Sequence, residues 1–271
     1  MKKLLSFTLI VVATWTWSWP FETAQSAEFF VGVDSRSTPF DAPSGDGGGA
    51  YPDNPNHNRL TLLFHHGNHF HGIGSYSYSG TAATPMLLDT NGNNRIPETY
   101  TNLEPLPLLP GSGAYTGKAA TNYVSGLEYS NLEMANVQSL SGVDDVLFNS
   151  SGGRWNGSFD EAHIHLQVLG VSSSDLKIGT PTEPDAFQFA DQHVGNGNEM
   201  FSLTPVLWVD QSAPVGHYWA EFQLVDLSGN FGNSGRFFFD VQHVPEPTTL
   251  AVGLIGVLGM VVSQRPRSCR V

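Results

Sequence analysis

Residues 60–71 read LTLLFHHGNHFH, an apolar run followed at once by a histidine-rich turn. The run Leu60 to Phe64 has the length and composition of a buried strand. Gly67 and Asn68 are turn-forming residues, and His69 to His71 then alternates polar with apolar positions. The stretch holds four of the ten histidines of the chain. We therefore expect a buried strand, a turn and a short extended segment that carries His69 and His71.

The same pattern of short apolar or alternating runs, bounded by Gly, Pro, Asn and Ser, recurs between residues 28 and 243. No long stretch has helical periodicity, so the pattern predicts an all-β fold with β-sandwich-like antiparallel sheets and long loops. A division into two lobes near residues 105–120 stays open, and residues 81–117 should have little regular structure. The expected strands are 29–33, 60–64, 73–78, 128–140, 145–148, 163–168, 201–209, 217–225 and 236–241.

The two ends have the composition of targeting segments. Residues 1–27 combine a basic start, an apolar run from Leu4 to Trp19 and small residues after Pro20, which is the layout of a secretory signal peptide. A retained membrane anchor is the alternative. Residues 244–271 hold Pro245-Glu246-Pro247, a thirteen-residue apolar run and terminal arginines. As a helix this run spans only ~20 Å of a ~30 Å hydrocarbon core, which favours a transient anchor over a stable span.

That order of features resembles the PEP-CTERM sorting tail of bacterial exported proteins. The resemblance implies recognition by an exosortase, a sorting helix that is cut off near residues 245–247, and delivery to the cell surface or extracellular matrix. Pro266 and Ser268 interrupt the basic cluster, which is a departure from the family pattern.

Charge and cysteine content narrow the choice of partners. Residues 28–243 carry seven basic and 23 acidic side chains, a formal charge of −16. Such a surface repels nucleic acid and concentrates cations. The single cysteine, Cys269, lies in the tail, so a metal site in the remainder must use histidines and carboxylates.

Two His-x-His pairs have the spacing of metal ligands. Residues i and i+2 of a strand share one face, so His69 and His71, and likewise His163 and His165, can turn both rings towards one ion. We expect the two pairs to lie on neighbouring strands and to share one transition-metal ion, with zinc preferred over copper or nickel. A site of three histidines and a water, or solvated histidines without metal, are the alternatives.

The remaining candidates are weaker. His65 and His66 precede the turn and are secondary ligands, and we interpret histidines 57, 193, 217 and 243 as surface or interface residues, with His217 a candidate fifth ligand. The start of residues 89–100 resembles a calcium loop, with Asp89, Asn91 and Asn93 as oxygen ligands. The glycine and the final glutamate of such a loop are absent, so an ordinary turn is the alternative.

Several blocks resemble a PEP-CTERM family described as repressed by the zinc-uptake regulator. The resemblance implies an exported protein made when zinc is scarce, with a role in zinc capture, storage or handover. Of the histidines, only His69 and His71 fall in a block that carries it. The blocks are NRLTLLF (58–64), NHFHGIGSYSY (68–78), NRIPETY (94–100), SLSG (139–142), FNSSGGRW (148–155) and AEFQLVD (220–226).

From these observations we expect an exported, surface-associated zinc-binding protein that is not an enzyme. Its imidazoles must be neutral to bind, so affinity should fall as the pH drops toward ~5–6. A structural or adhesive matrix protein is the first alternative. The second is a metal-dependent hydrolase, with Glu161 or Asp160 as general base. The expected partners are the metal ion and the export machinery, including the exosortase, with transient membrane association and no nucleic acid.

Overall fold

The computed structural model of the chain describes residues 27–37, 53–81, 83–188 and 191–244. These residues form a mostly β structure, which confirms the all-β, sandwich-like fold class. Nearly all of the expected signal peptide and sorting tail, including Cys269, lies outside the described residues. Within those ranges no helix is long and apolar enough to cross a bilayer.

The described residues contain sixteen strands and a few short helical turns. The strands are β1 (Phe29–Val33), β2 (Leu60–His66), β3 (His69–Gly72), β4 (Ser77–Thr81), β5 (Thr84–Leu88), β6 (Arg95–Ile96), β7 (Leu106–Pro110), β8 (Lys118–Ala120), β9 (Met134–Asn136), β10 (His163–Val171), β11 (Lys177–Gly179), β12 (Asp191–Asn196), β13 (Ser202–Leu203), β14 (Val206–Asp210), β15 (Gly216–Asp226) and β16 (Phe237–His243). The helices are η1 (Thr99–Thr101), η2 (Gly113–Tyr115), η3 (Val137–Leu140), α1 (Asp145–Phe148) and α2 (Ser150–Gly153).

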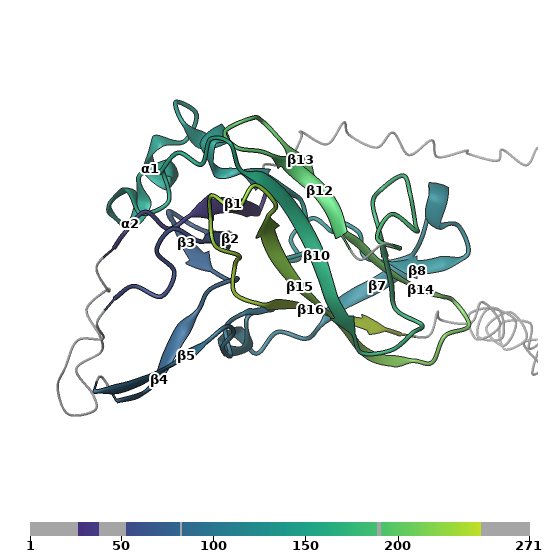
Figure 1. Cartoon of the computed structure of the whole chain (residues 1–271). Coiled ribbons are helices and arrows are strands. Elements are labelled where there is room, and N and C mark those ends of the chain that lie inside the picture. Colours follow the sequence, from purple (N-terminus) through teal and green to yellow (C-terminus); the bar gives the residue numbers. More distant parts are fainter. Residues whose placement is uncertain (1–26, 38–52, 82, 189–190, 245–271) are drawn as a thin grey trace, which may run out of the picture.

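The strands form two main sheets and a separate hairpin. The five-stranded sheet has the order β13-β9-β1-β2-β3, and the nine-stranded sheet has the order β11-β14-β8-β7-β16-β15-β10-β12, with β6 beside β16. Figure 1 shows the long strands β10 and β15 crossing the middle of the molecule, with β1, β2 and β3 to one side and the β4–β5 hairpin projecting below them. The long connections place strands that are distant in sequence side by side.

Aromatic side chains join the inner faces of the two sheets. Phe29 on β1 lies 6.1 Å from Phe239 on β16, measured between ring centroids, and both are fully buried. Phe64 on β2 lies opposite Phe29 in the strand register, with ring centroids 5.4 Å apart. Burying a phenylalanine contributes roughly 1.5–3 kcal/mol, so these contacts help to stabilise the packing of the two sheets. Phe64 is the last core residue of β2 before the histidines.

The sequence predicts five of the strands well and the others in part or not at all; the expected strand at 201–209, for example, is divided into β13 and β14. Strands at 29–33, 60–64, 163–168, 217–225 and 236–241 are confirmed within a few residues. Residues 145–148 form α1 instead, because the Asp144 side chain accepts a hydrogen bond from the Leu147 N–H and caps a helical turn. The expected strand at 128–140 shrinks to β9 followed by η3, and residues 73–76 turn away before β4. Residues 81–117 contain more strand than expected, namely β5, β6 and β7.

Candidate metal centre

A tight hairpin brings three histidines together at the end of β2 and β3. Gly67 has φ +64, which suits the first position of a type II′ turn, where only glycine is free of strain. This two-residue turn pairs His66 directly with His69, and Phe64 with His71. Opposite and alternate residues share one face, so His66, His69 and His71 extend the inner face of the sheet just beyond Phe64.

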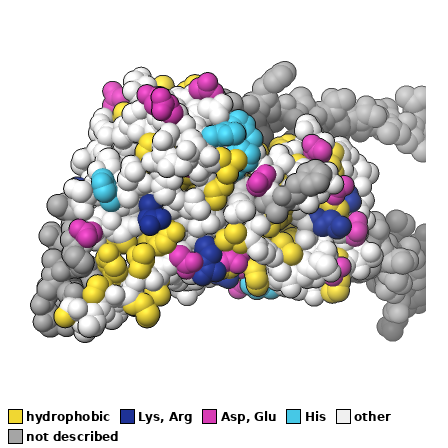
Figure 2. Space-filling view, viewed as in Figure 1, with side chains coloured by type: hydrophobic (Ala, Val, Ile, Leu, Met, Phe, Trp, Pro, Cys, Tyr) yellow, Lys and Arg dark blue, Asp and Glu magenta, His cyan; other side chains and the backbone are white. Residues whose placement is uncertain are grey.

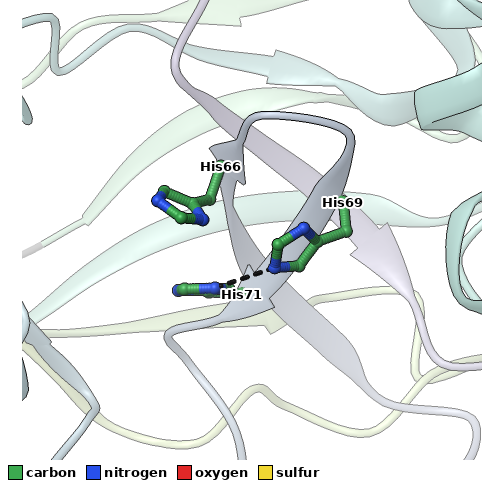
Figure 3. A group of neighbouring side chains, drawn as sticks. All are labelled: His66, His69 and His71. Atoms are coloured by element: carbon green, nitrogen blue, oxygen red, sulfur yellow. Dashed lines mark hydrogen bonds between the residues drawn. The ribbon is translucent and has the colours of Figure 1, made fainter.

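The three imidazoles face one another (Figure 3). Their nearest ligand atoms all lie within 4.8 Å of one another. The Nε2 atoms of His69 and His71 are 3.1 Å apart, and the ring of His66 is 4.8 Å from that of His71. Two nitrogens bound to one tetrahedral zinc ion at ~2.0–2.1 Å would be about 3.3 Å apart. The His69 and His71 nitrogens therefore have nearly the spacing of two zinc ligands, and a ligand nitrogen of His66 lies within 4.8 Å of both.

A buried carboxylate fixes the orientation of His71. Both oxygens of Glu98 lie near His71 Nδ1, at 3.1 and 2.9 Å. Glu98 is only 3 % exposed and accepts a further hydrogen bond, 3.0 Å long, from the hydroxyl of Tyr129. The Tyr129 ring in turn stacks on Phe64 with centroids 4.4 Å apart. A carboxylate on Nδ1 holds its proton there and leaves Nε2 as the lone pair that faces the other histidines.

The elements that hold this network come from both sheets. Glu98 follows β6, which pairs with β16 of the nine-stranded sheet, whereas His71 belongs to the five-stranded sheet. Tyr129 comes from the connection before β9 and has φ +65. The hydroxyl of Tyr100 completes the shell, at 3.2 Å from His71 Nδ1 and 3.3 Å from Glu98 Oε2. The cluster thus lies where the edge of one sheet meets a loop of the other.

The electrostatic environment favours a neutral His69 imidazole and neutral phenols at Tyr100 and Tyr129. Burial, followed by the charges of His71, His66 and His65, lowers the pKa of His69. Burial and the Glu98 carboxylate raise the pKa of Tyr100 and of Tyr129, so both hydroxyls stay protonated as hydrogen-bond donors. Neutral imidazole is the form that binds metal.

The structure separates the two secondary candidates. His66 belongs to the cluster, on equal terms with His69 and His71. His65 points to the opposite face of the hairpin, where it pairs in register with Phe70 and its Nε2 lies 2.8 Å from the carbonyl oxygen of Gly67. His65 is therefore not placed with the other three.

The expectation that His69/His71 and His163/His165 lie on neighbouring strands is wrong. β3 is an edge strand of the five-stranded sheet, whereas β10 lies between β15 and β12 in the nine-stranded sheet. Strand pairing instead brings His163 and His165 beside His193 on β12. The chain therefore holds two separate groups of histidines, and the strand order gives no basis for one ion shared between the two pairs.

The other sequence candidates have protein partners. Asp89 uses both carboxylate oxygens on the guanidinium of Arg236, at 2.7 and 2.8 Å, which lowers the pKa of Asp89. Asn91 accepts a hydrogen bond from the N–H of Asn93 in an ordinary turn. His217 Nε2 lies 2.8 Å from Asp240, away from both histidine groups. Calcium and a fifth ligand from His217 therefore gain no support.

Sequence reasoning missed Glu98, Tyr129 and His193. A signal existed for His66, because a two-residue Gly-Asn turn places its flanking residues opposite each other. No sequence signal links Glu98 to His71, which is 27 residues away, because the β6–β16 pairing brings them together. His193 depends on an irregularity in β12 that alternation does not reveal.

In comparisons with known proteins, no family model, no curated protein and no solved structure matches this chain.

Proposed function

We propose that this chain is an exported zinc-binding protein, and that His66, His69 and His71 form its principal site. Zinc capture, storage or handover is the function that these ligands serve best. The acidic surface expected from the composition would raise the local concentration of cations around the site.

The contact between His71 and buried Glu98 carries the proposal. Solvated histidines on a strand need no such partner, whereas metal-ligating histidines almost always have a carboxylate or carbonyl on the second ring nitrogen. Here that partner is only 3 % exposed and is itself held by Tyr129. Imidazole also suits copper and nickel, and zinc is preferred because three nitrogens leave the fourth tetrahedral position for a water or a recipient ligand.

The proposal includes no chemical step. Glu98 lies on the Nδ1 side of His71, away from the Nε2 atom that faces His69, so it is not placed to take a proton from a metal-bound water. Glu161 and Asp160 lie beside residues 196–199, next to β12 rather than at the hairpin. Binding and release of the ion are therefore the whole activity proposed for this site.

Export belongs to the same proposal through the two ends of the sequence. Residues 1–27 would direct secretion, and residues 244–271 would serve as the PEP-CTERM tail that an exosortase removes. Mass spectrometry of the protein from a host with the sorting machinery should find new ends near residues 27 and 245. An intact tail in that host would contradict the sorting step.

Zinc titration of the metal-free full chain tests the site. The triple variant H66A/H69A/H71A should lose the tightest binding event, because three ligands and the anchored ring are gone. Calorimetry against a competing chelator measures the change. Circular dichroism should show the same β content as the parent, because His66 and His69 are exposed and His71 is half-buried.

His65→Ala is the matched control. It removes a histidine from the same strand but from the opposite face, so zinc affinity should stay within about twofold of the parent. An equal loss in both variants would contradict the assignment. Absence of any tight zinc binding in the parent would favour the structural or adhesive matrix protein instead.

A further inference from the structure

The second group of histidines has its own geometry. The ring centroids of His163, His165 and His193 are 4.8, 4.9 and 5.3 Å apart in pairs. The Nε2 atoms of His163 and His165 are 3.3 Å apart, the separation expected for two ligands of one tetrahedral ion. Figure 2 shows histidine side chains gathered at the surface over this part of the nine-stranded sheet.

A β-bulge creates this grouping. Along β10 and β12 the register runs Ile164 opposite Gly195 and then His165 opposite His193, so Val194 is the extra residue. Without the bulge, Val194 would lie opposite His165 and His193 would face the other side of the sheet. Instead Val194 is buried and His193 is exposed beside the other two rings. Bulges of this kind re-aim a side chain, and here the side chain is a third imidazole.

One nitrogen in the group is buried without a hydrogen-bond partner. His165 Nδ1 is inaccessible to solvent, and Asp191 Oδ1 lies 3.6 Å away, just beyond hydrogen-bonding distance. A buried polar atom left unsatisfied costs roughly 1–3 kcal/mol, so the arrangement is incomplete as it stands. A small shift of Asp191 would give His165 the same carboxylate support that Glu98 gives His71.

We infer that His163, His165 and His193 form a second site for a divalent transition-metal ion, independent of the hairpin site, with Asp191 as the residue that positions His165. Three imidazoles suit zinc and its neighbours in the first transition series. The inference shares the ligand class of the proposed function but rests on other residues, so either can fail alone.

This site requires movement before it can bind. His193 Nε2 now lies 3.3 Å from Asn196 Oδ1, so the ring must turn from Asn196 towards the ion. Asp191 must also close on His165, and its side chain is 46 % exposed. The hairpin site already has its carboxylate in place. Because second-shell support is worth roughly 10–100-fold in metal affinity, the second site should be weaker by about that factor.

Zinc binding to the metal-free full chain, measured by equilibrium dialysis and elemental analysis, tests the inference. The parent should bind two ions in two resolved steps. H66A/H69A/H71A should keep one ion, at the affinity of the weaker step, and H163A/H165A/H193A should keep one at the affinity of the tighter step. His57→Ala, an exposed histidine outside both groups, is the matched control and should bind two ions.

Two results would overturn the second site. One is a single ion bound by H163A/H165A/H193A and by the parent alike. The other is no ion bound by H66A/H69A/H71A while circular dichroism shows the parental fold. Conversely, one ion bound by the hairpin variant and none by H163A/H165A/H193A would support the second site and contradict the hairpin proposal. Cobalt substitution in the hairpin variant provides an independent readout, because intense visible bands are expected only while His163, His165 and His193 surround the ion.

Discussion

The two histidine groups contain the same three side chains, but they differ in how firmly a neighbouring carboxylate holds one of the rings. In the hairpin group, His71 is bonded to a carboxylate that is only 3 % exposed, and a stacked tyrosine holds that carboxylate in turn. In the β10–β12 group, the corresponding carboxylate, Asp191, is half in solvent and has not closed on His165. For the two proposed sites, the contrast means that ligand spacing alone does not set the expected affinity, because the support behind each ring determines how much must be reorganised on binding.

Zinc binding should stabilise the fold most at the hairpin site, where Glu98 already holds His71 in place. Zinc at roughly 100 times the dissociation constant of the hairpin site should add about 2.7 kcal/mol to the free energy of unfolding. Hydrogen exchange should show the added protection first in β2, β3 and the Glu98 loop. Added protection that appears first in β10 and β12 would reverse the proposed order of the two sites.

Glu98→Gln tests the support itself. The substitution keeps the size of the side chain but removes the charge that holds the proton on His71 Nδ1. Hairpin-site affinity for zinc should fall roughly 10–100-fold, as for other second-shell changes. The matched change Asp191→Asn should have a smaller effect, confined to the weaker site. Calorimetric titration of both variants measures the difference, and equal effects would remove the distinction drawn between the groups.

Asp226→Asn should weaken zinc binding by the β10–β12 histidines, because Asp226 holds the backbone at the start of β10. Asp226 accepts hydrogen bonds from the N–H groups of His163, at 2.7 Å, and Phe231, at 2.9 Å, and so fixes the first residue of β10. We expect a loss of about 2 kcal/mol in unfolding free energy at pH 7. Weaker-site affinity should fall while hairpin-site affinity is unchanged. Urea unfolding with and without zinc separates the two effects.

The lowered pKa of Asp226 predicts that the stability of the fold depends on pH. Burial pushes the pKa of Asp226 upward, but the hydrogen bonds from His163, Ser228 and Phe231 outweigh it and hold the pKa below its ordinary value. A carboxylate with a lowered folded-state pKa stabilises the fold above about pH 3.9, and this contribution is lost as the pH falls through the folded-state value. The stability of the parent should therefore decline more steeply than that of Asp226→Asn below about pH 4. Parallel acid profiles would contradict this role.

Tyr129→Phe should have a moderate effect on the hairpin side. It removes the hydroxyl that donates to Glu98 and keeps the ring stacked on Phe64. We expect a loss of about 1 kcal/mol in unfolding free energy, together with a smaller loss of zinc affinity than Glu98→Gln causes. Tyr100→Phe is the control, because Tyr100 is 53 % exposed and should cost less. Thermal unfolding of the two variants measures the loss of stability, which should be larger for Tyr129→Phe than for Tyr100→Phe.

Asn196→Ala should produce the smallest change, and in the opposite direction. Asn196 Oδ1 lies 3.3 Å from His193 Nε2 and would hold the ring away from a bound ion, so its removal should raise the affinity of the proposed weaker site about two- to threefold, equivalent to an exposed hydrogen bond of about 0.5 kcal/mol. Competition titration in the H66A/H69A/H71A background isolates this site. A decrease in affinity would show that Asn196 supports the site instead of restraining His193.

Local patterns predicted the parts of this molecule that depend on local rules. Alternation and turn residues located β1, β2, β10, β15 and β16, and the spacing in residues 69–71 located two of the three candidate ligands of the hairpin group. They failed where a cap or a bulge intervened, at α1 and at His193. They also could not reveal Glu98, whose place beside His71 depends on the pairing of β6 with β16, more than 140 residues later. The position of the supporting carboxylate depends on long-range strand pairing, which has no periodic pattern in the sequence.

The residues beneath the hairpin histidines are buried, whereas two of the histidines are exposed, and this difference affects which positions can be substituted. Glu98 and Tyr129 are buried and hydrogen-bonded to each other, so most substitutions there should lower the stability of the fold. His66 and His69 are exposed on the hairpin, so substitutions there should cost little stability. A cysteine or an aspartate at either position would alter the metal preference of the proposed site without any change to Glu98 or Tyr129. Selection, or a protein engineer, can therefore retune this site one exposed residue at a time.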